Sequence, residues 1–473
     1  MTLESLALRV LLPSFNGTTV ADEVLRLLDD GLGGLCLFGS NTADGPEAVA
    51  GYAARVRSVS PGAVLAVDEE GGDVTRLHVA DGSPVLGPLA LGAADDLELT
   101  HAVGRAIGLE LAAVGINLDL GPVADVNSNP DNPVIGTRSF GPSAPAVAAH
   151  VAAWTRGLQS AGVAACAKHF PGHGDTAQDS HLALPVLDLD LDALAARELV
   201  PFVAAVEAGT AAVMTSHVVV PAFDPELPAT LSVPVLALLR ERLGFRGVIV
   251  SDALDMAGAS AGRGIPEAAV LSIAAGADLL CIGADNSVEQ VRTIQAALVD
   301  AVKQGRLPEE RVAEAASAVS RLGEPLPDSS VAGPVEETEA SQTNRLVAAG
   351  AARSVTVTGE LPPLGGARVV RVDSAGTIAI GGAPWGLPTD VVVAPGATDL
   401  PDGPLVVQVR DAHRQPDVQR TLSAVGPGSV VVEWGWPGPL GRRTDGLPTI
   451  DARGWSRPGA VAVTEVLRRA GWD

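Results

Sequence analysis

Short apolar runs that recur along the first two thirds of the chain are the feature that most limits its fold. Eight of them follow one another at fairly even spacing, and helical patterns such as 20–28, 99–113 and 144–161 fill the gaps. The runs are Leu8–Leu12, Gly34–Phe38, Ala63–Val67, Ile116–Leu120, Val163–Ala167, Ala212–Thr215, Gly247–Val250 and Asp278–Ile282. Eight buried strands alternating with helices over about 320 residues predict a (β/α)8 barrel of the TIM type, with a doubly wound sheet as the alternative.

Polar side chains follow five of these runs directly. Because the carboxyl ends of barrel strands meet on one rim, such groups would gather there, whereas a doubly wound sheet would spread them along an edge. This clustering favours the barrel over the alternative. The groups are Asp68-Glu69-Glu70, Asp125 and Asn127, Lys168-His169, Ser216-His217 and Ser251-Asp252.

The last third of the chain has a different organisation. Residues 323–342 are rich in Pro, Ser and acidic residues, which is typical of a linker. Beyond them, short apolar runs alternate with helical patterns at 417–424 and 460–470. We therefore expect a catalytic barrel over 1–322, a linker over 323–342 and a smaller α/β sandwich domain over 343–473. The expected strands of this domain are 354–357, 369–372, 391–394, 405–409 and 430–432.

The charge balance limits the partners of the protein. A formal net charge of −24 argues against nucleic acid and against an anionic membrane surface. The N-terminal residues Met1–Ser5 contain no basic segment before an apolar run, and no apolar stretch of membrane-spanning length follows. Cys36, Cys166 and Cys281 lie far apart inside apolar runs, so buried thiols are expected in place of disulfides. We expect a soluble cytoplasmic protein that is a monomer or a weak homo-oligomer.

The segment Lys168–Thr176, followed closely by Asp179-Ser180-His181, concentrates ionisable side chains. It holds three of the eight histidines of the chain. Pro171 and Gly172 prevent a regular helix or strand across it, so we expect a loop. Loops carried by a rigid scaffold are where catalytic groups commonly lie.

Two common motifs in the chain are rejected on their context. His169 and His173 have the spacing of metal ligands on a helix, but Pro171 removes the helix, so we expect no metal and no cofactor. Residues 258–262 match G-x-S-x-G, yet a nucleophile elbow follows a strand directly, and the nearest apolar run ends near Val250. With 53 glycines in the chain, we interpret this match as chance.

Asp179 and His181 have the spacing of an acid/base pair on a loop. A carboxylate that accepts from one imidazole nitrogen fixes the tautomer and leaves the other nitrogen free to move a proton. Asp252 follows a strand run and is placed for a carboxylate nucleophile on the rim. Taken alone, Asp252 is equally well explained as a helix N-cap, and Lys168 as the ion-pair partner of a neighbouring acid. Several such residues at successive strand ends favour a function.

The segment Lys168–Thr176 with Asp179-Ser180-His181 resembles glycoside hydrolase family 3, in particular its bacterial β-N-acetylglucosaminidase branch. Further segments agree in order over roughly residues 5–320. They are Val67–Gly72, Asn132–Gly136 with Arg138–Gly141, Met214–His217 and Ser251–Met256. The resemblance implies a (β/α)8 barrel, in agreement with the strand pattern. The C-terminal region resembles, more weakly, the second domain of two-domain members.

The resemblance also implies a retaining mechanism. Asp252 would attack the anomeric carbon and form a glycosyl-enzyme, with Asp255 as its nearest rival for that role. His181, oriented by Asp179, would protonate the leaving oxygen and then activate the acceptor. The positions that would hold the sugar hydroxyls and the N-acetyl group are Asp68, Arg76, Arg138, Lys168 and His169, with His217 nearby. One position departs from the family pattern, because Asp73 follows Glu-Gly-Gly where the family usually has Arg.

These residues lead to one expected function and several alternatives. The resemblance implies a retaining exo-β-N-acetylglucosaminidase that removes terminal N-acetylglucosamine from cell-wall muropeptide fragments, so we expect a small glycoside as its ligand. An aromatic content of only 3% fits a pocket for one sugar better than a long cleft. A phosphorylase is the sharpest alternative, because a catalytic His repels phosphate less than a carboxylate does. A β-glucosidase-type enzyme and an inactive sugar-binding protein are the others, and the presence of both Asp252 and His181 disfavours the last.

Overall fold

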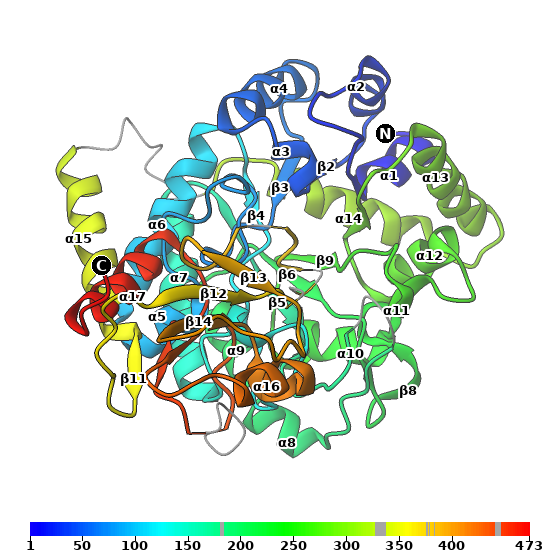
Figure 1. Ribbon diagram of the computed structural model, residues 1–473. Helices are drawn as coiled ribbons and strands as arrows, with labels where there is room; N and C mark the ends of the chain where they lie inside the picture. The colour runs from blue at the N-terminus through cyan, green and yellow to red at the C-terminus, as the bar shows by residue number, and fades with distance from the viewer. Residues whose placement is uncertain (180–183, 327–336, 375–376, 378, 383, 440–445) are drawn as a thin grey trace.

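The computed structural model describes residues 1–179, 184–326, 337–374, 377, 379–382, 384–439 and 446–473 (Figure 1). Eight parallel strands of the N-terminal part form one sheet in the order β1-β10-β9-β6-β5-β4-β3-β2. The strands are β1 (Leu11–Pro13), β2 (Gly34–Leu37), β3 (Val64–Val67), β4 (Leu118–Asp119), β5 (Ala164–Phe170), β6 (Ala212–Thr215), β9 (Val248–Ser251) and β10 (Leu279–Gly283). This is the cyclic order of a TIM-type barrel, as predicted.

Closure of the barrel depends on a close approach at Gly33, just before β2. The Gly33 N–H donates to the carbonyl oxygen of Leu8 at 3.2 Å. A Cβ at Gly33 would lie 2.2 Å from the carbonyl oxygen of Arg9, so a side chain there would push the first and last strands of the order apart.

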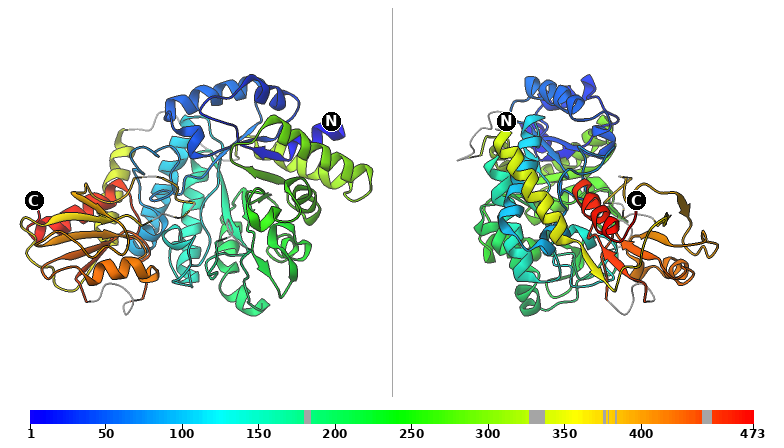
Figure 2. Two further views of the ribbon diagram at one scale, coloured as in Figure 1. Left: turned by 45° about the vertical axis from the view of Figure 1, so that its right-hand side comes forward. Right: turned by 60° about the vertical axis from the view of Figure 1, so that its left-hand side comes forward.

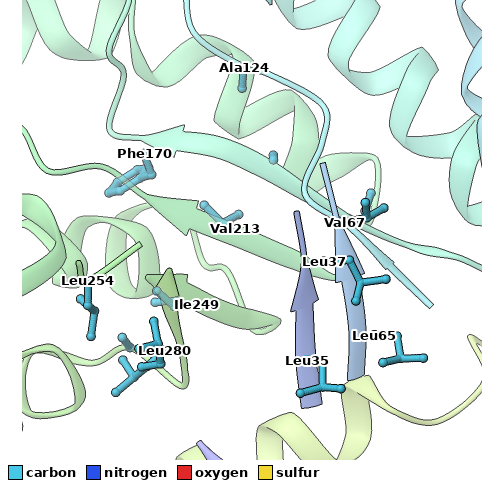
Figure 3. Packing of buried hydrophobic residues seen from close by; sticks show 14 of the residues in the cluster. Leu35, Leu37, Leu65, Val67, Ala124, Phe170, Val213, Ile249, Leu254 and Leu280 are labelled. Atoms are coloured by element: carbon cyan, nitrogen blue, oxygen red, sulfur yellow. The ribbon is translucent and has the colours of Figure 1, made fainter. Parts of the chain in front are cut away.

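The strands divide their apolar side chains between two sides of the sheet. Val64 and Ala66 of β3 join a cluster inside the barrel, with Cys36, Leu118 and Met214. Alternate residues join the larger cluster between the sheet and the helices (Figure 3). The alternation explains why the sequence shows continuous apolar runs, since both faces are buried. The labelled outward set in Figure 3 is Leu35, Leu37, Leu65, Val67, Ala124, Phe170, Val213, Ile249, Leu254 and Leu280.

Helices connect successive strands and form the outer layer. They are α1 (Leu3–Arg9), α2 (Asp22–Asp29), α3 (Gly39–Thr42), α4 (Pro46–Val59), α5 (Pro88–Ala94), α6 (Leu97–Ala113), α7 (Ala144–Ser160), α8 (Leu191–Ala196), α9 (Leu199–Glu207), α10 (Val233–Ala237), α11 (Ala257–Ser260), α12 (Ile265–Ala275), α13 (Val288–Lys303) and α14 (Glu309–Leu322). An antiparallel pair, β7 (Val219–Val220) and β8 (Asp224–Pro228), is inserted between β6 and α10.

Several strand boundaries differ from the sequence-based prediction, and two of these differences matter for the site or the closure of the barrel. The run Leu8–Leu12 was expected to be all strand, but α1 continues to Arg9 and only Leu11–Pro13 pair with β10. The Thr2 hydroxyl caps this helix by accepting from the Ser5 N–H, and Leu8 is buried on its inner side. At β5 the strand is longer than expected and reaches Phe170, so Lys168 and His169 lie at the strand end and the loop begins after them.

The C-terminal domain is built around a second, six-stranded sheet in the order β11-β16-β15-β14-β12-β13. All its neighbours are parallel except β11, which pairs antiparallel with β16. The strands are β11 (Thr356–Thr358), β12 (Arg368–Val372), β13 (Val391–Val393), β14 (Leu405–Val409), β15 (Val430–Glu433) and β16 (Thr449–Asp451), with helices α16 (Pro416–Ser423) and α17 (Arg457–Arg469). The sequence did not indicate β16, because three residues after Pro448 are too short a pattern.

Helix α15 (Glu337–Ser354) joins the two parts of the molecule. It begins within the segment expected to be a linker and ends within the first expected strand of the second domain. It packs against α5 and α6 of the barrel and against α17 of the second domain. Figure 2 shows the C-terminal domain packed against one side of the barrel.

Candidate active site

A cavity of about 280 Å³ opens at the carboxyl ends of the barrel strands. It is small enough to suit a single sugar ring. Its wall includes residues at or just after the ends of β2, β3, β4, β5, β6, β9 and β10, and one residue of the C-terminal domain, Ala379. Of the site residues predicted from sequence, those that line it are Asp68, Arg76, Arg138, Lys168, His169 and Asp252. The structure therefore brings together residues that are up to 184 positions apart (252 − 68) in the chain.

Four charged side chains form the centre of one cavity wall. Lys168 Nζ lies 2.6 Å from Asp68 Oδ1 and 2.7 Å from Glu70 Oε1. Arg138 donates twice to Glu70, through Nε at 2.9 Å and a terminal nitrogen at 2.7 Å. This geometry is a bidentate, charge-assisted pair, the strongest class of side-chain hydrogen bond.

The charge states of this network follow from its burial and its pairing. Burial alone would raise the pKa of the Glu70 carboxyl, but Arg138 and Lys168 reverse the effect and hold that pKa below its usual value. Burial likewise opposes the charge on Lys168, and Asp68 and Glu70 raise its pKa above the ordinary lysine value. Glu70 and Lys168 are thus charged at neutral pH, and their ion pairs hold both side chains rigidly in the cavity wall.

A second, linked network orients two histidines. His169 Nδ1 lies 2.7 Å from Asp125 Oδ2, while Asp125 Oδ1 accepts from the His173 N–H at 2.7 Å. The other ring nitrogen of His169 lies 3.5 Å from an Arg138 nitrogen. Burial lowers the pKa of His173 to about 4, so His173 is neutral at pH 7. Asp125 therefore fixes the ring of His169 in the cavity wall, as carboxylates commonly do for functional imidazoles.

Asp252 follows β9 directly and lies on the cavity wall. Its Oδ1 accepts from the Ala253 N–H at 2.8 Å, and its own N–H donates to Thr215 Oγ1 at 3.4 Å. The end of β9 and these hydrogen bonds fix the position of the Asp252 backbone, from which the carboxylate extends. Asp255, the rival nucleophile, also lines the cavity but is more exposed and lies farther from the strand end.

His217 occupies a different position from the other predicted binding residues. Its side chain is fully buried, and it is not among the described residues that line the cavity. Its Nε2 lies 2.9 Å from the carbonyl oxygen of Ala253, so that nitrogen carries a hydrogen, and Nδ1 lies 2.9 Å from Thr230 Oγ1. The ring supports the backbone next to Asp252 from behind.

The predicted acid/base pair lies only partly within the described residues. Asp179 is half-buried at the end of the loop that follows β5, and His181 lies outside the described residues. The start of this loop is held by Asp175, which accepts from Ser128 Oγ at 2.9 Å and pairs with Arg197 at 2.7 Å.

Three members of the site were not predicted as site residues, namely Glu70, Asp125 and His173. Glu70 and Asp125 do follow strand runs, which is the one sequence feature that marks them. Sequence alone does not distinguish a buried acid that pairs with two cations from an acid that faces solvent. Among the described residues, no group of three or more His, Cys, Asp or Glu side chains is arranged to hold a metal ion.

Asp73, the position that departs from the family pattern, faces the C-terminal domain. Its Oδ1 accepts from Arg410 at 2.6 Å and from the Trp455 N–H at 3.1 Å, and its Oδ2 accepts from Thr137 Oγ1 at 2.8 Å. In the same loop, a terminal nitrogen of Arg76 donates to the carbonyl oxygen of Ala379 at 2.9 Å. Within the parts of the chain that the structure describes, no helix combines the length and the apolarity needed to cross a bilayer.

Comparison with known proteins agrees with the fold. Residues 7–322 match the family model of the glycosyl hydrolase family 3 N-terminal domain. A β-hexosaminidase A from Pseudoalteromonas piscicida is 34% identical over 341 residues, which is 66% of this chain and 57% of that relative. The chain thus spans little more than half the length of that relative.

Solved structures extend the likeness over both domains. The glycoside hydrolase family 3 β-N-acetylglucosaminidase from Paenibacillus sp. str. FPU-7 superposes with a TM-score of 0.86 at 32% identity, covering 99% of this chain and 97% of that one. NagZ from Neisseria gonorrhoeae, solved with N-trifluoroacetyl-D-glucosamine, superposes with a TM-score of 0.60 at 31% identity, over 72% of this chain and 97% of that one. The family match over most of the chain and the shared barrel lead to one conclusion: the chain belongs to glycosyl hydrolase family 3 and is a glycoside hydrolase.

Proposed function

We propose that this glycoside hydrolase is a retaining exo-β-N-acetylglucosaminidase. The observation that carries the proposal is the placement of Asp252 on the wall of the same small cavity as the buried Asp68–Lys168–Glu70–Arg138 network. Relatives named as β-hexosaminidases and β-N-acetylglucosaminidases support the sugar specificity.

In the proposed reaction, the Asp252 carboxylate attacks the anomeric carbon and the bond to the leaving oxygen breaks. His181 gives its proton to that oxygen, and a covalent glycosyl-Asp252 ester remains. His181 then takes a proton from water, which attacks the same carbon and releases the sugar with its original configuration. Asp179 orients the imidazole, whose ordinary pKa near 6.5 suits a group that is acid in one step and base in the next.

The remaining cavity side chains would bind the sugar. Asp68 and Arg76 offer an acceptor and a donor for ring hydroxyls, while Lys168 and Arg138 offer donors that are already fixed by their partners. His169 offers its Nε2, and Asp125 fixes the ring through Nδ1. Because these groups are paired before the ligand arrives, little reorganisation is needed when it binds. His217 would act indirectly, through the backbone at Ala253.

We further propose where the enzyme acts, on which substrates, and what each part of the chain does. The substrates would be cell-wall muropeptide fragments that end in N-acetylglucosamine, and the enzyme would act in the cytoplasm as a monomer or a weak homo-oligomer. Residues 1–322 would carry out the chemistry, 323–342 would connect the domains, and 343–473 would cover one side of the site.

Product analysis with 4-nitrophenyl β-N-acetylglucosaminide, with and without phosphate, tests this proposal. Release of free N-acetylglucosamine in both conditions is the expected result, and the initial product should have the β configuration by NMR. N-acetylglucosamine 1-phosphate formed only with phosphate would make the protein a phosphorylase. Turnover of the glucoside in place of the N-acetylglucosaminide would overturn the sugar specificity, and no turnover of either would favour a sugar-binding protein.

A further inference from the structure

The C-terminal domain reaches the sugar cavity at Ala379. This residue lines the cavity and packs beside Val123, Val134 and Ile135 of the barrel. Its carbonyl oxygen accepts from the Arg76 guanidinium at 2.9 Å. The position of a predicted sugar-binding arginine therefore depends on the backbone of another domain.

Asp73 ties that domain to the loop that carries Arg76. Arg410 and Asp73 are both almost fully buried, with side-chain exposures of 6% and 4%. Glu70 N–H donates to the carbonyl oxygen of Val74, and Arg76 N–H donates to Glu69 Oε2 at 2.8 Å. The tight turn thus holds Asp73 and Arg76 in a fixed relation to each other.

The chain next to Ala379 lies close to this ion pair. Ile380, the next residue, lies with Asp73, Thr137 and Arg410 around a narrow gap of about 20 Å³. The Arg410 guanidinium stacks over the Trp385 ring at 4.7 Å from its centroid. The ion pair therefore lies next to Ile380 on one side and contacts Trp385 through Arg410 on the other.

We propose that Asp73 is a positioning residue for sugar binding, and that it acts by seating the C-terminal domain so that the Ala379 carbonyl holds Arg76 in the cavity. The inference rests on the proposed function for the identity of the sugar. Other interdomain ion pairs differ from this one because they are exposed. Arg353 with Asp96 and Arg457 with Asp81 lie at the surface, where such pairs contribute little.

The variant that tests the proposal is Asp73→Asn. It keeps an oxygen for Thr137 or Trp455 but removes the charge that Arg410 needs. We expect KM for 4-nitrophenyl β-N-acetylglucosaminide to rise about tenfold with kcat changed less than about twofold, since the contact made by Arg76 is present in both ground and transition states. The affinity for free N-acetylglucosamine, measured by calorimetry, should fall by a similar factor. The matched control is Arg353→Ala, which breaks an exposed interdomain pair and should leave both values unchanged.

A double-mutant cycle shows whether Asp73 acts through Arg76. In an Arg76→Ala background, Asp73→Asn should have no further effect on KM or on the affinity for N-acetylglucosamine. Additive effects of the two substitutions would overturn the proposal, because they would mean that Asp73 acts by another route.

Loss of folding is addressed by a second variant. Asp73→Asn leaves a buried Arg410 unpaired, whereas the double variant Asp73→Asn/Arg410→Met leaves no buried charge and should fold. A raised KM in the folded double variant supports the proposal, and a wild-type KM overturns it. If the wild-type protein does not cleave the glycoside, the proposed function fails. If it cleaves but Asp73→Asn binds N-acetylglucosamine as the wild type does, only this inference fails.

Discussion

The carboxyl ends of the barrel strands surround a cavity lined with charged side chains, whereas the carboxyl ends of the second sheet are covered with tryptophan and closed against the barrel. Trp434 and Trp436 follow β15, and Trp455 follows β16. The Trp455 ring packs on Gly82 of the barrel, where a Cβ would lie 1.7 Å from a ring carbon. Trp436 likewise lies beside Gly136 of the barrel, so both tryptophans belong to the interface between the domains.

The comparison shows two uses of the same sheet geometry. Parallel α/β sheets bind ligands beyond the carboxyl ends of their strands, because the connecting loops gather there. In the barrel this edge holds paired charges that remain accessible to a small ligand. In the second sheet the same edge is filled by the neighbouring domain, so Asp73 of the barrel occupies a place where a ligand group would otherwise lie.

The largest effect is expected for a substitution that changes only the site at the carboxyl ends of the barrel strands. Asp252→Asn should lower kcat by at least about 10³-fold, because an amide does not form the glycosyl ester. The melting temperature should stay near that of the wild type. A matched control is Asp373→Asn, which changes an exposed carboxylate at the carboxyl end of β12 in the second sheet. Near-normal turnover by Asp252→Asn would remove Asp252 from the mechanism and point to Asp255.

The acid/base assignment gives the next largest effect. His181→Ala should lose about 10²- to 10⁴-fold activity toward alkyl glycosides and much less toward 4-nitrophenyl glycosides, because an activated leaving group needs no proton. Steady-state rates across a series of leaving groups measure this difference. An equal loss for all leaving groups would contradict the acid role in the first step.

Two buried glutamates, one at the carboxyl ends of the strands of each sheet, allow the two regions to be compared directly. Glu70 pairs with Lys168 and Arg138, whereas Glu433 accepts backbone N–H groups of Asp411, Ala412 and Gly435. Glu70→Gln should lower kcat/KM and also reduce the free energy of unfolding by about 3 kcal/mol, since it leaves buried cations short of a partner.

Glu433→Gln should reduce the free energy of unfolding by about 1 to 2 kcal/mol, because its amide cannot accept from every N–H that faces it. Its kcat/KM should remain that of the wild type. Chemical denaturation and kinetics on both variants provide the measurement. A loss of activity in Glu433→Gln equal to that in Glu70→Gln would contradict the view that only the barrel glutamate serves the cavity.

The smallest expected effect concerns pH. Burial raises the pKa of Glu198 to about 7, although Arg197 opposes the shift, and the Glu198 side chain packs against Gly172 in the loop after β5. The folded state then binds this proton more tightly than the unfolded state, so the contribution of Glu198 to stability should be complete below about pH 4.5 and be lost as the pH rises toward 7. Denaturation midpoints measured across this range should depend less on pH in Glu198→Gln. An unchanged dependence would show that another group titrates.

Much of the barrel was predictable, because its strands are buried on both faces and so appear as continuous apolar runs. The boundary at α1 was not, since Leu8 is buried whether it lies in a helix or in a strand. The residues at successive strand ends were recognisable as a group, and most of those predicted to bind sugar do line the cavity. Their pairing was not predictable, because the contact between Glu70 and Arg138 joins positions brought together only by the closed sheet.

The network at Lys168 also sets how the enzyme should respond to salt. Asp68 and Glu70 balance the charges of Lys168 and Arg138, so these four side chains together add no net charge to a protein of net charge −24. A neutral glycoside therefore approaches without long-range repulsion, whereas an anionic one must move against the field of the whole molecule. Added salt screens that field, so rising ionic strength should lower KM for anionic substrates and leave KM for neutral ones nearly constant.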